Sequence, residues 1–161
     1  MLPRVVIALS LIVLASALSQ ATSTNCIDKV HQYGVSFDLT GVNKAAVTKA
    51  WETKNPYVPG DVILWKNIHW NHGSATTREC VPCSPKTAIT DLFLAADQPA
   101  LPCGLNKGML MDDISKLMGE PDGRTKDGLV YLYPPLDKNE EITFQFKKGK
   151  LWGVRWSFYN D

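Results

Sequence analysis

The sequence lacks the short motifs that identify many enzyme families. It contains no Gly-x-Ser-x-Gly nucleophile motif, no phosphate-binding loop and no glycine-rich dinucleotide fingerprint. It also lacks an excess of either charge, because 17 basic and 16 acidic residues leave a formal net charge of +1. Nucleic acids and anionic membranes are bound by concentrated basic surfaces, so we expect neither as a partner. We therefore predict a protein that is not an enzyme and has no cofactor.

One long apolar run is present, at the N-terminus. Arg4 precedes the run VVIALSLIVLASAL, and small residues follow near Ala21. This pattern is typical of a secretory signal peptide, and the run is too short for a convincing membrane span. We expect residues 1–21 to be removed, which leaves a periplasmic or secreted chain without a membrane span. An uncleaved anchor helix is the alternative.

Cysteine is scarce but even in number. The four cysteines are Cys26, Cys80, Cys83 and Cys103. In an exported chain such a set predicts two disulfides, with three possible connectivities that the sequence does not separate. Each bridge is expected to contribute about 2–4 kcal/mol to stability.

A second interpretation of two of these cysteines is a metal or thiol site. His69 and His72, followed by Cys80 and Cys83, have the ligand types and pair spacings of a tetrahedral zinc site. An oxidising compartment favours disulfides instead, so we expect no bound metal. A reactive cysteine pair would need a helix N-terminus to lower its pKa, and the strand-like run after Cys83 does not predict one. A secreted metal or thiol enzyme is the alternative to a binding protein.

The last third of the chain has the clearest periodicity. Residues 108–119 are predicted to form a helix, with apolar side chains at i, i+3 and i+4 in Ile114, Leu117 and Met118. From residue 142 the apolar side chains alternate with polar ones, which predicts strands over 142–147 and 151–158. Lys148 and Gly149 between them suit a tight hairpin turn.

The first half contains an apparent copy of this helix. Asn43 is a good N-cap, and Val47, Ala50 and Trp51 have the same apolar spacing, although two such helices could match by chance. Each helix is followed by room for three strands; in the first half we expect them near 61–66, 76–80 and 86–95, with a further possible strand at 35–39. We predict an α+β fold of two tandem helix-plus-antiparallel-strand repeats, residues 22–103 and 104–161, forming a helix-covered sheet stapled by disulfides. Trp51 and Met118 should then be buried at equivalent positions.

Short motifs flank these predicted elements. They are Gly108-Met109 before the apolar stripe, Gly119-Glu120-Pro121 after it and Gly149-Lys150-Leu151 in the hairpin, with a second copy of the start at Gly41-Val42-Asn43-Lys44. Together these motifs resemble a module of small bacterial envelope proteins, which include the β-lactamase inhibitor protein and the small lipoprotein of the outer-membrane protein assembly machine. Leu110 stands where that family usually has a capping Ser or Thr. The resemblance implies the fold and the compartment, but its members differ in function.

A sheet covered by helices on one face leaves its other face available to a partner. We expect Gln145 and Arg155 on that face, together with Tyr131 and Tyr133, because tyrosine and arginine are common interface hot spots. The alternative is that the tyrosines are ordinary core residues. Trp70, in an aromatic loop expected at 68–74, is a second candidate anchor.

We therefore predict a non-enzymatic protein-binding protein. Its most specific form is an inhibitor or immunity-type protein that occludes a toxin or a hydrolase. An envelope-assembly adaptor, whose partner would be an envelope component, is the alternative among binding proteins.

Overall fold

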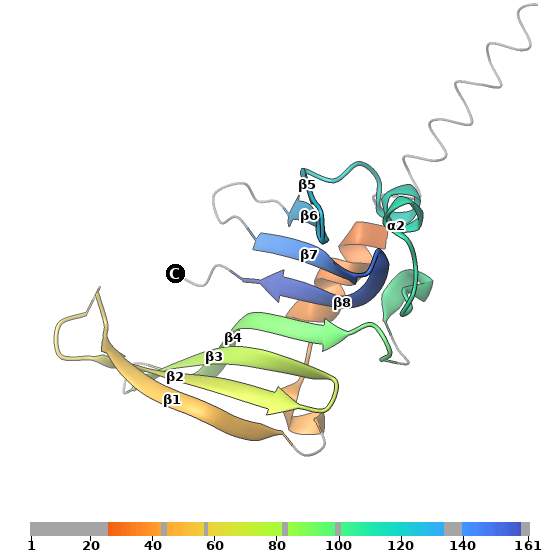
Figure 1. The fold of residues 1–161 in the computed structure, drawn as a ribbon. Helices are drawn as coiled ribbons and strands as arrows, with labels where there is room; N and C mark the ends of the chain where they lie inside the picture. The colour runs from red at the N-terminus through yellow and green to blue at the C-terminus, as the bar shows by residue number, and fades with distance from the viewer. Residues whose placement is uncertain are drawn as a thin grey trace, which may run out of the picture.

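The protein folds around one antiparallel sheet of eight strands (Figure 1). The computed structural model describes residues 26–42, 45–56, 58–81, 84–98, 101–133 and 140–158. The strand order across the sheet is β1-β2-β3-β4-β8-β7-β6-β5. The strands are β1 Ala46–Lys54, β2 Val62–Trp70, β3 Gly73–Val81, β4 Ser84–Ala95, β5 Gly123–Thr125, β6 Gly128–Tyr133, β7 Glu140–Lys147 and β8 Lys150–Ser157.

The predicted α+β class of two helix-plus-strand repeats is wrong, because strands dominate the described fold. Residues 46–51 of the expected first helix belong to β1, which pairs with β2. Asn43, the expected N-cap, lies outside the described residues. The apolar spacing of Val47, Ala50 and Trp51 fits a helix, but Lys49, Trp51 and Thr53 also alternate as a strand requires. Pairing with β2 decides between the two patterns. Trp51 is consequently half-buried on a strand and not buried under a helix, whereas Met118 is buried.

The helices also differ partly from expectation. Residues 26–35 are helical, and the possible strand expected at 35–39 is not formed. The 3-10 helices η1, Leu39–Gly41, and η2, Pro102–Gly104, precede β1 and α2 respectively. The C-terminal helix is confirmed as α2, Met111–Met118, which buries Ile114 and Met118. Leu110 has no side-chain hydroxyl to cap this helix; instead its backbone N–H donates to Asp113 Oδ2 at 3.3 Å.

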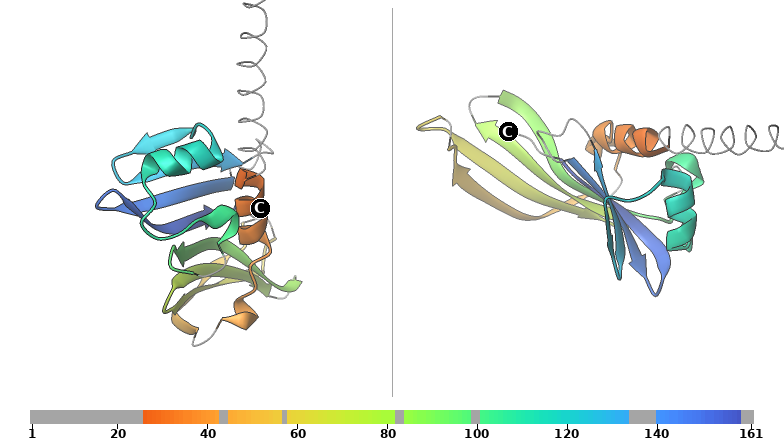
Figure 2. Two further views of the ribbon diagram at one scale, coloured as in Figure 1. Left: turned by 90° about the vertical axis from the view of Figure 1, so that its right-hand side faces the viewer. Right: turned by 90° about the horizontal axis from the view of Figure 1, so that it is seen from above.

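The helix of residues 26–35 and α2 lie on the same face of the sheet (Figure 2, right). The core fills the space between this face and the helices, and Trp156 of β8 is fully buried there. Its indole Nε1 donates a hydrogen bond of 2.9 Å to the Val30 carbonyl. The core contains Val30, Leu92, Leu94, Ile114, Met118, Leu129, Tyr131, Ile142, Phe144, Leu151, Val154 and Trp156.

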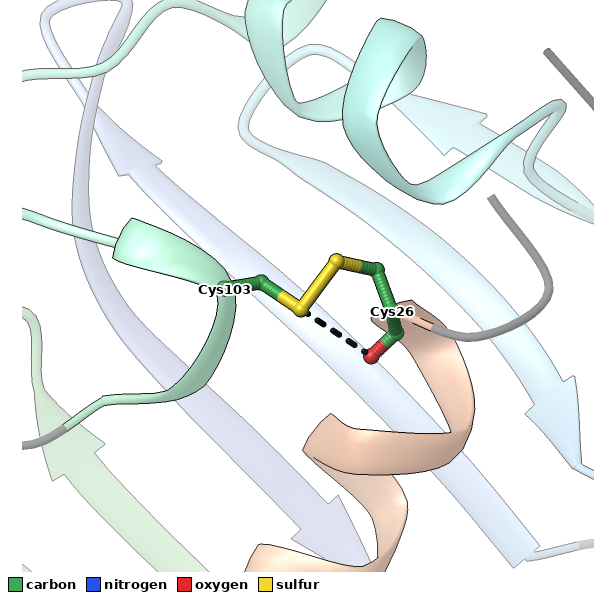
Figure 3. Close-up of a disulfide and its surroundings, with 2 residues drawn as sticks. All are labelled: Cys26 and Cys103. Atoms are coloured by element: carbon green, nitrogen blue, oxygen red, sulfur yellow. Dashed lines mark hydrogen bonds between the residues drawn. A yellow bond between two sulfur atoms is a disulfide. The ribbon is translucent and has the colours of Figure 1, made fainter. Parts of the chain in front are cut away.

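A disulfide fixes the helix of residues 26–35 to the segment before α2 (Figure 3). It joins Cys26 to Cys103, which are separated by 77 positions in the sequence. Cys80 is also disulfide-bonded, whereas Cys83 and the predicted signal peptide lie outside the described residues. The predicted use of cysteine in bridges is confirmed for Cys26 and Cys103.

The hairpin β7–β8 has the tight turn that the sequence predicts. Lys148 and Gly149 have positive φ angles of 54° and 73°, as a two-residue type I′ turn requires. The pairing then shifts by one residue, because Gln145 pairs with Gly153 and Phe146 with Leu151. This bulge leaves Trp152 41% exposed, although its alternation with Val154 and Trp156 predicts a core position.

Candidate functional site

The face of the sheet opposite the helices is the candidate site, and we call it the open face. Side chains alternate between the two faces along each strand. Thr77, Leu92, Val154 and Phe144 point into the core. Their neighbours along the paired strands therefore lie on the open face. No described helix covers it (Figure 2). Its members include Lys49, Trp51, Trp65, Asn67, Thr76, Arg78, Asp91, Phe93, Thr143, Gln145 and Arg155.

Two tryptophans form an aromatic pair at the β1 end of the open face. Trp51 and Trp65 are directly opposite each other in the register, and their rings stack with centroids 6.0 Å apart at 8°. Trp65 Nε1 donates to Thr53 Oγ1 at 2.9 Å, and Lys49 Nζ lies 5.2 Å from the Trp51 ring centroid. Both indoles are half-buried. They therefore offer a fixed apolar surface to a partner.

Arg155 lies on the open face, as the alternation of β8 predicts. Its Nε donates to Asp91 Oδ2 at 2.8 Å, and its side chain is 49% exposed. This hydrogen bond raises the pKa of Arg155 above its ordinary value, although partial burial acts in the opposite direction. Asp91 therefore orients the guanidinium while half of the side chain stays accessible. Gln145 is a diagonal neighbour, since it pairs with Gly153 and Arg155 pairs with Thr143.

Tyr131 lies on the opposite face of the sheet, in the core. It is 4% exposed, packs edge-on against Phe144, and donates from its hydroxyl to the Gly119 carbonyl at 3.0 Å. Burial raises the pKa of Tyr131 to about 12. Its position ties β6 to the end of α2 and withdraws it from any partner.

Tyr133 also lies on the helix side, within a polar network. Its ring stacks on His31 with centroids 3.6 Å apart, and its hydroxyl donates to Asp28 Oδ1 at 3.0 Å. Burial, and next the hydrogen bond with Asp28, raise the pKa of Tyr133. His31 Nε2 lies 2.5 Å from Glu140 Oε2. The network holds the helix of residues 26–35 on β6 and β7.

Trp70 is the last residue of β2 and faces the helix side. Its ring stacks on Phe37 with centroids 5.9 Å apart, and it packs against the core. The residues expected as a loop at 68–74 instead form the end of β2, a short turn and the start of β3. Trp70 is thus a packing residue of the helical layer.

The histidine–cysteine site considered as the alternative is not assembled from its described members, His69, His72 and Cys80. His69 pairs with Ser74, and Cys80 pairs with Ile63, so about 20 Å of strand separates the two positions. His72 Nδ1 lies 3.2 Å from Asp97 Oδ1 instead. Within the residues that the structure describes, no three His, Cys, Asp or Glu side chains are grouped to hold a metal ion.

Three aromatic members of the open face do not follow from the sequence patterns used above. The apolar spacing around Trp51 predicts a helix, the strand expected at 61–66 does not indicate which face Trp65 occupies, and the alternation of β8 predicts a core position for Trp152. The alternation of Lys49, Trp51 and Thr53 is the signal that could have placed Trp51 on a strand.

None of the described helices is long and apolar enough to cross a membrane. Comparison with family models, with curated proteins and with solved structures found no match to this chain.

Proposed function

We propose that this chain is an exported protein of the inhibitor or immunity type, which binds a toxin or a hydrolase through its open face. The supporting observation is the stacked pair of Trp51 and Trp65, which is half-exposed on a sheet face that no described helix covers. Tryptophan and arginine are the residues most enriched among interface hot spots. The open face carries both, since Arg155 lies on β8 of the same surface.

The mechanism is steric occlusion by a rigid surface. The sheet is backed by a packed core, and a disulfide anchors its helical layer, so the open face changes shape little on binding. The tryptophans would bury apolar area against the partner. Arg155, oriented by Asp91, would offer its remaining N–H groups to a partner carboxylate, for which the planar guanidinium is suited.

Export is supported by the N-terminal sequence pattern and by the disulfide between Cys26 and Cys103. Disulfides persist in oxidising compartments and are rare in the cytosol. A periplasmic or extracellular location is therefore part of the proposal.

The experiment begins with capture of a partner from the envelope and secreted fractions of the source organism by the exported protein. The captured protein is then purified, and its activity and its affinity for the chain are measured by inhibition assay and calorimetry. We expect dose-dependent loss of the partner's activity. We also expect Trp51→Ala and Trp65→Ala each to weaken binding by at least about tenfold, which is about 1.4 kcal/mol.

Val47→Ala is the matched control, because Val47 is 56% exposed on β1 but faces the helix side. It should leave the affinity unchanged. Binding without loss of the partner's activity would favour an envelope-assembly adaptor. Equal affinities for Trp51→Ala, Trp65→Ala and Val47→Ala would refute the open face as the binding surface.

A further inference from the structure

The open face is hollowed beside the tips of the β5–β6 and β7–β8 hairpins, at the end of the sheet away from Trp51 and Trp65. The hollow is shallow and open to solvent, with a volume of about 630 Å³. Residues of β5 to β8 and of both turns line it, among them Thr125, Asp127, Val130, Glu141, Gln145 and Trp152.

Several polar groups in the hollow are available to a ligand. The side chains of Asp127 and Gln145 make no hydrogen bond to any other residue in the described ranges. The Thr143 hydroxyl donates to Glu141 Oε1 at 2.5 Å. The second oxygen of that carboxylate can accept a hydrogen bond from a ligand. A carboxylate accepts hydrogen bonds, and an amide both donates and accepts them. The hollow is therefore suited to a ligand that both donates and accepts hydrogen bonds.

One aromatic ring supplies the apolar part of the hollow. Trp152 is 41% exposed, and Phe93 supports its ring at a centroid distance of 5.0 Å and an angle of 42°. Gly153 leaves the room for Phe93, since an added Cβ there would lie 2.2 Å from the Phe93 ring. Lys147 Nζ lies 5.8 Å from the indole centroid, on a flexible side chain that a ligand could displace. Trp152 is thus a pre-positioned apolar platform.

The charges of the hollow narrow the class of ligand. Asp127 and Glu141 are acidic, and Lys147 and Lys148 are basic, so the lining is balanced. Binding of a phosphate or sulfate group would need an excess of basic residues in the lining. Binding of a cationic ligand would need an excess of acidic residues. A lipid chain would need a lining of mostly apolar side chains. A neutral ligand with many hydroxyl groups and one apolar face satisfies all of these constraints.

We propose that the hollow binds a neutral saccharide, with the apolar face of one sugar ring against Trp152. Gln145, Asp127 and Glu141 would bind its hydroxyl groups. The hollow shares Thr143 and Gln145 with the open face, but saccharide binding does not depend on the protein-binding function proposed above.

The test uses the purified exported protein and three probes, the hexasaccharides of β-1,4-linked glucose, α-1,4-linked glucose and β-1,4-linked N-acetylglucosamine. Binding is measured by calorimetry and by the shift of the indole N–H signals in NMR spectra, with the Trp152 signal assigned by its loss in Trp152→Ala. We expect at least one hexasaccharide to bind and to shift the Trp152 signal. Trp152→Ala and Gln145→Ala should each weaken its binding by at least about tenfold.

Trp51→Ala is the matched control, because it removes a half-exposed tryptophan from the same face outside the hollow. It should keep the saccharide affinity. If Trp152→Ala fails to fold, Gln145→Ala alone decides the outcome. The proposal is overturned if no hexasaccharide binds at millimolar concentration, or if Trp51→Ala weakens binding as much as Gln145→Ala does. Loss of a protein partner in Gln145→Ala, with no saccharide bound, would also overturn it and identify the hollow as a protein contact.

Discussion

Gly34 lies directly against the indole ring of Trp156, where the helix of residues 26–35 crosses the centre of the sheet. A Cβ atom added to Gly34 would be 2.4 Å from Trp156 Cδ1, a separation that real side chains do not allow. The same indole donates a hydrogen bond to the Val30 carbonyl. Close packing and hydrogen bonding therefore fix one spacing between helix and sheet.

Gly34→Ala should destabilise the protein by about 1–3 kcal/mol, because overpacking a filled core forces the helix or Trp156 to move. The free energy of unfolding is measured from urea denaturation. Gly41→Ala is the control, since nothing lies within 4 Å of a Cβ added there, and it should be close to neutral. Equal stability of both variants would contradict this account of helix packing.

Replacing both Cys26 and Cys103 by serine should lower the stability by about 2–4 kcal/mol, because the unfolded chain gains freedom when the cross-link is lost. Thermal unfolding of the purified variant measures the change. Each single variant should lose as much stability as the double one. In the unaltered folded protein, Cys26, Cys80 and Cys103 should not react with a thiol reagent, since all three are disulfide-bonded.

Tyr131 should make stability fall at high pH. Its pKa is raised from 10.0 to about 12 in the folded protein, so the unfolded state releases this proton first. The raised pKa contributes about 2–3 kcal/mol to the free energy of unfolding. This contribution is fully present below pH 10 and is lost as the pH rises towards 12. Urea denaturation at pH 9 and pH 11.5 should show a smaller loss for Tyr131→Phe than for the unaltered protein.

Tyr131→Phe should itself lower the free energy of unfolding at neutral pH. Tyr131→Phe removes the hydroxyl that donates to the Gly119 carbonyl, so it should start about 0.5–1.5 kcal/mol less stable. The decisive quantity is the difference between the two pH values within each protein. Identical differences in both would show that Tyr131 does not carry the effect.

Arg155→Ala should separate binding from stability. Its ion pair with Asp91 is half-exposed, and such pairs contribute about 0–1 kcal/mol, so the melting temperature should change little. Affinity for the captured partner should fall by more than about 1 kcal/mol. Arg155→Lys keeps the charge but loses the planar fork, so it should restore only part of the affinity. If Arg155→Ala binds like the unaltered protein, this arginine is not an anchor.

The C-terminal third could be predicted because its signals are local. The stripe of α2 and the Lys148-Gly149 turn lie within single elements, and both are found where expected. Arg155 and Gln145 reach the open face because alternation in adjacent paired strands suffices to place them. Trp152 does not follow the alternation, because the bulge opposite Gln145 adds a residue that no local pattern announces.

The N-terminal half could not be predicted in the same way, because distant partners decide its structure. Trp51 belongs to a strand because Trp65 lies opposite it, and the residues around Trp51 fit a helix equally well. Tyr131 and Tyr133 were expected at a partner's surface, but Gly119 and Asp28, from elements outside the strand, hold them on the helix side. Burial of this kind depends on the complete fold.

The order of the strands has a consequence for how the chain reaches its native state. The two halves of the sheet meet where β4 pairs with β8, through Asp91–Ala95 and Gly153–Ser157. β8 is the last described strand, so the pairing of β4 with β8 can form only after every other described strand has been synthesised. Trp156 of β8 is also the residue on which the helix of residues 26–35 packs. Contacts this distant in sequence slow folding, and until the seam forms, β4 exposes an unpaired edge that another chain could join.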